Sequence, residues 1–248
     1  MKRLVILLAP LLLAALPARA EAINPRQEYR TCLHLARTKP DEGWEEAIAW
    51  TSLGGGEPAR HCAAVALIGL GKLEEAATRL EALASQSRAA PALRAEMLAQ
   101  AAQAWLHAGQ PEKALADLDT GLSLVPGQPD LLLDKAVVYA QAAHYPKAVE
   151  ALSQVLKTQP NRVEAMVLRA SAYRYMDKLD LAKDDIARAL VLEPGVPDAL
   201  LERGMIRRLE DNTAGAREDW LKVINAVPDS TAADTARRNL ELMDVKVK

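Results

Sequence analysis

The sequence contains no phenylalanine, and aromatic residues make up only 4% of its 248 residues. Half of the residues are hydrophobic, with alanine and leucine dominant. Sheets favour β-branched and aromatic side chains, whereas alanine and leucine favour helices. The composition therefore predicts an all-α fold with a core of small and aliphatic side chains.

The chain also lacks an excess of positive charge. It has 31 basic and 33 acidic residues, which leaves a formal net charge of −2. Proteins that bind nucleic acid usually present a basic face. This charge balance argues against a nucleic-acid partner.

Motifs of known catalytic and metal sites are missing as well. HExxH, GxSxG and CxxCH do not occur. The stretch IGLGK at residues 68–72 lacks the four-residue gap between glycines and the Ser or Thr after lysine that a phosphate-binding loop needs. Acidic residues follow expected helix faces, as in KLEEAA, which is the pattern of a solvated surface. We expect no catalytic residues, no metal and no cofactor.

Only one long apolar run is present, and it stands at the start of the chain. MKR is followed by LVILLAPLLLAALP and then by the small residues of ARA at 18–20. This is the three-part pattern of a cleavable secretory signal peptide over residues 1–20. The run is shorter than the ~20 apolar residues of a membrane span and contains Pro10. We predict cleavage after Ala20, with Ala22 and a retained anchor as alternatives, and export to a bacterial periplasm.

Prolines reveal an internal repeat in the second half of the chain. Twelve residues before each proline lies an alanine, eight before lies a large apolar residue, and twenty-four before lies a small one. The prolines, 34 residues apart, are Pro126, Pro160, Pro194 and Pro228. Small residues recur where two helices cross closely, and proline follows a helix because it cannot continue one. The period predicts stacked helical hairpins that share one core.

This period, with its order of small, aromatic, small, large and proline positions, resembles the tetratricopeptide repeat (TPR) family. The resemblance implies a right-handed α-solenoid of stacked helical hairpins, here over residues 21–248 as a single unit. The clear repeats are 95–128, 129–162, 163–196 and 197–230. Residues 24–56 and 57–90 are degenerate repeats, and 231–245 would form a C-terminal capping helix.

Some residues depart from the family pattern. Lys135, Arg169 and Arg203 stand where the family often has leucine. Arg207 replaces the aromatic residue of the earlier repeats, which predicts looser packing in the last repeat.

The resemblance also implies that the first helices of successive repeats line a concave groove. The groove positions, carried over by register, are Ala99, Gln103, Leu106, His107, Leu133, Val137, Gln141, Val167, Ser171, Arg174, Tyr175, Leu201, Met205 and Arg208. The basic clamp that some family members use for a terminal carboxylate is absent from them. An apolar floor with a few polar neighbours suits an extended or helical peptide. The alternative is that these residues pack against each other or against a neighbouring segment. We expect alanine at Arg174 and Tyr175 to leave folding intact but to weaken capture of a partner.

The two cysteines fall at matching places in the degenerate repeats. Cys32 lies 15 residues before Ala47, and Cys62 lies 14 before Ala76, the alanine that marks each second helix. Facing residues on neighbouring helices can reach the Cα separation of about 4.4–6.8 Å that a disulfide needs. Because export leads to an oxidising compartment, we favour a Cys32–Cys62 disulfide. Unpaired core cysteines, or a metal or catalytic site with His34 and His61, remain alternatives.

Three functions follow from these observations. The first is a non-catalytic adaptor in the cell envelope that holds a peptide or helix of another envelope protein. The second is a cell-wall glycan binder, for which Trp44, Trp50, Tyr145 and Tyr175 are the candidate stacking residues. The third is an enzyme that uses the Cys/His residues.

Overall fold

The computed structural model describes residues 24–245, so the predicted signal peptide at residues 1–20 lies outside the described residues. Within the described part the chain forms 13 α-helices and no strand, which confirms the all-α prediction. No helix in this part is both long and apolar enough to cross a membrane.

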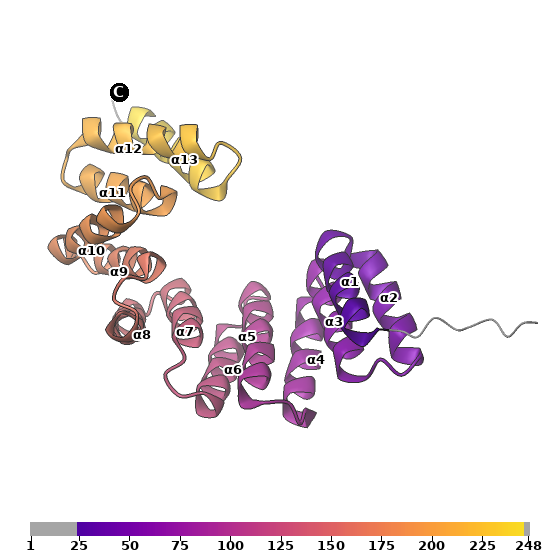
Figure 1. Ribbon diagram of the computed structural model, residues 1–248. Helices are drawn as coiled ribbons and strands as arrows, with labels where there is room; N and C mark the ends of the chain where they lie inside the picture. Colours follow the sequence, from indigo (N-terminus) through magenta and orange to yellow (C-terminus); the bar gives the residue numbers. More distant parts are fainter. Residues whose placement is uncertain (1–23, 246–248) are drawn as a thin grey trace, which may run out of the picture.

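The helices follow one another with short connections. Their bounds are α1 Pro25–Thr38, α2 Pro40–Ser52, α3 Gly56–Gly69, α4 Leu73–Gln86, α5 Pro91–His107, α6 Pro111–Leu124, α7 Pro129–Gln141, α8 Tyr145–Thr158, α9 Val163–Tyr175, α10 Leu179–Leu192, α11 Pro197–Leu209, α12 Thr213–Ala226 and α13 Thr231–Val245. Consecutive helices pack on each other along the whole series, and α5, α7, α9 and α11 also contact one another in turn. Figure 1 shows the resulting solenoid as an arc, with α1–α4 in one arm and α11–α13 in the other.

Local sequence explains where many helices begin. Proline occupies the first turn of α1, α2, α5, α6, α7, α8 and α11, where its missing N–H costs no hydrogen bond. Asn24 caps α1, and its Oδ1 accepts hydrogen bonds from the backbone N–H groups of Arg26 and Gln27.

The hairpin turns share one backbone conformation. Gly109, Ala143, Asp177 and Asp211 lie 34 residues apart, and each has a φ between 57° and 73°. This left-handed conformation costs little for glycine and more for residues with a Cβ. Packing of the two helices on either side therefore holds the turn where glycine is absent.

The repeated small residues lie where the helices cross. The alanines before the prolines, Ala114, Ala148, Ala182 and Ala216, are fully buried. The preceding small positions, Ala102, Ala136 and Ala170, are at most 1% exposed. The prediction that small residues recur where two helices cross closely is thus confirmed at these positions.

The last repeat does not pack loosely, and that expectation was wrong. Trp220 occupies the large apolar position and is completely buried. Its indole N–H donates to the Leu201 carbonyl at 3.2 Å. Gly204 makes room for it, because a Cβ at this residue would lie 2.3 Å from Trp220 Nε1. The tryptophan thus fills the space that the small residue at 204 leaves open.

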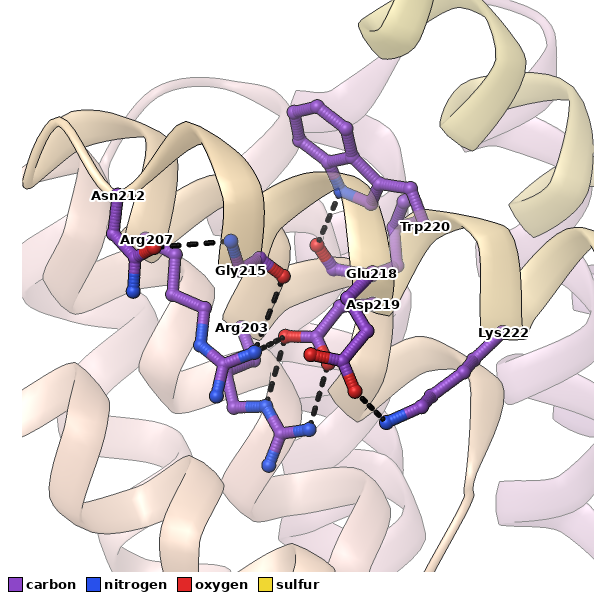
Figure 2. A network of polar contacts seen from close by, with 9 residues as sticks. Arg203, Arg207, Asn212, Gly215, Glu218, Asp219, Trp220 and Lys222 are labelled. Carbon is purple, nitrogen blue, oxygen red and sulfur yellow. Dashed lines mark hydrogen bonds and ion pairs between the residues drawn. The ribbon is translucent and has the colours of Figure 1, made fainter.

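The basic residues that depart from the family pattern form ion pairs. Arg169 donates two hydrogen bonds to Asp185, at 2.7 and 2.8 Å. Arg203 donates likewise to Asp219, at 2.9 and 2.7 Å. Figure 2 shows Asp219 between Arg203 and Arg207, the latter donating at 2.7 Å. Because Asp219 is fully buried, these two guanidinium groups satisfy a carboxylate inside the core.

Candidate functional site

Cys32 and Cys62 form a disulfide between α1 and α3, with their Cα atoms 6.1 Å apart. The described residues contain no free cysteine. They also contain no group of three or more His, Cys, Asp or Glu side chains placed to hold a metal ion. The cysteines therefore join two helices at the degenerate end of the stack.

His61 has a separate role that the sequence did not indicate. Its Nδ1 lies 2.8 Å from the Tyr29 hydroxyl, and its Nε2 lies 3.1 Å from Gln100 Oε1. An amide oxygen only accepts, so Nε2 donates and Nδ1 accepts from tyrosine. Burial lowers the pKa of His61, which favours this neutral form. With both ring nitrogens occupied, His61 links α1, α3 and α5 and is not placed to act on the cysteines.

The predicted groove residues lie on α5, α7, α9 and α11, but they do not line one continuous channel. Six of them border three separate hollows. Ala99 borders a hollow of about 140 Å³ between α5 and α7. Val137 and Val167 border one of about 500 Å³, and Arg174, Met205 and Arg208 border one of about 670 Å³.

The remaining predicted positions fall into three groups. Leu133 is 6% exposed and belongs to the hydrophobic core, so its assignment to the groove was wrong. The assignment failed because it was carried over by register, and a small error in register moves a residue from the surface face of a helix to its buried face. Leu106, Ser171 and Leu201 are half-buried, whereas Gln103, His107, Gln141 and Tyr175 are exposed.

Arg174 is bound within the protein. Its Nε donates to Glu202 at 2.5 Å, which connects α9 with α11, and both side chains are nearly buried. Its guanidinium also lies 4.3 Å from the centre of the Tyr175 ring. Tyr175 in turn stacks on Tyr145 of α8, with ring centres 4.7 Å apart. Arg174 therefore organises the surface more than it offers a free charge to a partner.

The hollow of about 500 Å³ has an apolar floor and a charged rim. Its lining side chains come from α7, α9 and the segment that leads into α11. The apolar ones are Val137, Val163, Val167, Leu168 and Val196, and the polar ones are Asn161, Arg162, Glu164, Glu193 and Asp198. An apolar recess with a polar rim is the usual form of a peptide-binding surface.

A row of carboxylates along these first helices was not predicted from the sequence. Glu96, Asp130, Glu164 and Asp198 are separated by 34 residues each and are all exposed. Each borders at least one of the two smaller hollows. The 34-residue phase alone would have found them, because equal phase places residues at equivalent points of successive repeats.

Comparison with known proteins agrees with this architecture. Two family models, both described as tetratricopeptide repeat, match residues 105–171 and 167–231. No curated protein matches the chain. Together the two matched ranges span residues 105–231, just over half of the chain.

Several solved structures are similar in fold. MamA (41–end) from Desulfovibrio magneticus RS-1 has a TM-score of 0.58 and 23% identity, and the alignment covers 70% of this chain and 97% of that one. The C-terminal part of a TPR repeat-containing protein from Cytophaga hutchinsonii has a TM-score of 0.62, 15% identity, and coverages of 89% and 96%. For a human IFIT1 dimer with PPP-AAAA the values are 0.66, 16%, 90% and 54%.

Identities this low establish the fold alone. The family models show more, because together they match residues 105–231, which run from the end of α5 through α12. The chain belongs to the tetratricopeptide repeat family.

Proposed function

We propose that this protein is a non-catalytic adaptor that holds a peptide segment of another protein on the surface formed by its first helices. The observation that carries this proposal is the hollow of about 500 Å³ floored by Val137 and Val167. Both side chains remain partly exposed although they lie on well-packed helices. Apolar side chains in a recess of a rigid scaffold gain free energy when a partner covers them.

We further propose that the protein acts in the bacterial cell envelope. The signal-peptide pattern of residues 1–20 supports export, and the disulfide is consistent with an oxidising compartment. N-terminal sequencing of the protein purified from the periplasmic fraction tests this. A start at Glu21 or Ile23 is expected, whereas a full-length chain in the cytoplasm would contradict it.

The two alternative functions have less support. The cysteines are bonded and His61 is held by Tyr29 and Gln100, so the Cys/His residues do not form a nucleophile and base. For glycan binding, Tyr145 and Tyr175 stack on each other and Trp50 is buried. Trp44 is half-buried, with the Arg79 guanidinium 5.2 Å from the centre of its ring. These aromatic side chains do not offer a set of free faces to sugar rings.

Photocrosslinking in living cells tests the adaptor function. A photoreactive residue at Val137 or at Met205 should crosslink one recurring partner, which mass spectrometry then identifies. The matched control is the same residue at Asp184, an exposed position of the second helix α10. Equal products from all three positions, or none from Val137 and Met205, would contradict binding on the first helices.

The structure revises the expectation that alanine at Arg174 leaves folding intact, because Arg174 and Tyr175 differ in how much the fold depends on them. Arg174→Ala would leave Glu202 buried without its partner, so we expect a loss of about 3–5 kcal/mol in unfolding free energy. Tyr175→Ala changes a side chain that is 58% exposed and should cost less than about 1 kcal/mol. Urea denaturation of both variants checks this. Equal stabilities would show that the Arg174–Glu202 pair contributes little.

A further inference from the structure

The carboxylate row borders two separate hollows on the first helices. Glu96 and Asp130 border the hollow between α5 and α7, and Glu164 and Asp198 border the larger one on α7 and α9. The first helices that carry them contact one another in order, α5 with α7, α7 with α9, and α9 with α11. The row therefore crosses four successive repeats, and its last two members, Glu164 and Asp198, stand at the rim of the valine floor.

Helix stability does not account for the whole row. Asp130, Glu164 and Asp198 are each the second residue of a helix, where a negative charge favours the helix N-terminus. Glu96 is different, because α5 begins at Pro91 and Glu96 is its sixth residue. The helix-terminus effect falls off within the first turn. Glu96 therefore has the same phase as the other three carboxylates although it does not stabilise the N-terminus of its helix.

The negative charge of this surface is only partly compensated. Arg162 is the one basic side chain among the described residues that line the two hollows. It already pairs with Asp130 at 2.5 Å and with Glu164 at 3.3 Å. Burial, reinforced by the charges of Asp130 and Glu164, raises the pKa of the neighbouring Asp134 to about 6. A partner that brings positive charge would relieve this repulsion.

The spacing of the carboxylates favours one backbone conformation for such a partner segment. Axes of packed helices lie about 8–10 Å apart, and we take this as the approximate spacing of neighbouring carboxylates in the row. A polyproline II segment rises ~3.1 Å per residue with three residues per turn, and therefore presents one side every ~9 Å. In a β-strand, side chains on one side repeat every ~7 Å, which is below this range.

We propose that this surface binds an extended, basic segment of a partner protein, with Lys or Arg at every third position against the carboxylate row and a small aliphatic residue over the valine floor. The inference rests on the proposed adaptor function and specifies the chemistry of its partner. Arg and Lys on the partner pair with Glu96, Asp130, Glu164 and Asp198, while Val137 and Val167 receive the aliphatic side chains.

Synthetic peptides test the proposal on the mature, disulfide-bonded protein. The probe is a fluorescent twelve-residue peptide with four Lys-Pro-Val units. One control peptide has glutamate in place of lysine, and another has the same composition with the lysines in one block. Fluorescence anisotropy should show binding of the first peptide that weakens as salt increases, and at least tenfold weaker binding of both controls.

Variants locate the binding site. The four-fold variant Glu96→Gln, Asp130→Asn, Glu164→Gln, Asp198→Asn should weaken binding of the Lys-Pro-Val peptide about tenfold, since single exposed ion pairs contribute little and four add up. The matched control is Glu112→Gln with Asp184→Asn, exposed carboxylates on second helices, and should change Kd less than twofold. Circular dichroism checks that both variants are folded.

The outcomes separate this inference from the adaptor function. If no peptide binds, if the glutamate peptide binds as well as the lysine peptide, or if the four-fold variant binds normally, the basic partner is overturned. The adaptor function is judged independently by crosslinking from Val137 in cells. A crosslinked partner segment that is acidic or uncharged would overturn this inference while leaving the adaptor function in place.

Discussion

At the residue scale, the last repeat shows that a smaller residue in its first helix makes room for a larger residue in its second helix. Three repeats combine an alanine in the first helix with a leucine or isoleucine in the second, as in Ala170 and Ile186. The last repeat combines Gly204 with Trp220, and the indole stands where the alanine Cβ would be. The sequence showed both substitutions but not that each requires the other, because that depends on which side chains meet across the crossing.

We expect Gly204→Ala to destabilise the protein by about 1–3 kcal/mol, the usual cost of overpacking a tight core. The double variant with Trp220→Leu recreates the pair used in the other repeats and should recover part of this loss. A double-mutant cycle from urea denaturation measures the coupling. Additive effects of the two substitutions would show that they are independent.

Asp117 is a second residue whose behaviour follows from its place in the repeat. It is in phase with Asp185 and Asp219, but Ala101 occupies the position from which Arg169 and Arg203 reach those carboxylates. Asp117 is 7% exposed, and its Oδ2 has no hydrogen-bond partner. Burial, with the nearby Glu81 charge adding to it, raises the pKa of Asp117 to about 7.

This pKa makes stability depend on pH. Between about pH 4 and 7 the unfolded chain has released the Asp117 proton while the folded protein retains it, so the unfolding free energy falls as pH rises. Asp117→Asn should therefore be more stable than the parent by about 1–3 kcal/mol at pH 8, with the difference shrinking toward pH 4. Denaturation at both pH values measures this. A pH-independent difference would show that Asp117 does not titrate in this range.

At the scale of helices, the sequence was most informative where one position determines a structure by itself. Proline and Asn24 define helix starts, and the buried alanines define the crossings. The cysteine positions also could be placed, because their distance from Ala47 and Ala76 put them at equal height on α1 and α3. Contacts between repeats, such as Arg174 with Glu202, depend on side-chain direction and could not be read from the period.

Reduction of the disulfide should weaken the N-terminal helices. The bond closes a sequence separation of 30 residues, for which the chain-entropy estimate is about 3–4 kcal/mol. Hydrogen exchange with and without reductant should show lost protection in α1–α3 and little change in α7–α12. A Cys32→Ala, Cys62→Ala variant is the control and should not respond to reductant. Unchanged protection in α1–α3 after reduction would contradict a stabilising role.

At the scale of the whole molecule, stability is expected to be distributed along the stack. Helices mostly contact their neighbours in the chain, so each repeat depends on the next one. Ala232 and Ala236 of α13 pack in the same cluster as Trp220 and Val223. This helix covers the end of the last repeat.

Removal of α13 should therefore act locally. Truncation after Ser230 would expose Trp220 and Val223, at about 1.5–3 kcal/mol for each large apolar side chain. Hydrogen exchange should show faster opening of α11 and α12, with α5–α8 unaffected. Uniform loss of protection along the chain would mean that the solenoid unfolds as one cooperative unit.

The equal spacing of Glu96, Asp130, Glu164 and Asp198 has a statistical consequence. A short ligand with two cations at the matching separation can occupy any of three neighbouring pairs of carboxylates. These registers are related by the repeat, so the proposed ligand would populate more than one of them and would shift by one repeat without full dissociation. The middle register would be the weakest, because Arg162 already pairs with Asp130 and Glu164. Only a ligand long enough to engage all four carboxylates has a single alignment, so segment length would determine whether the partner is held in one position or slides.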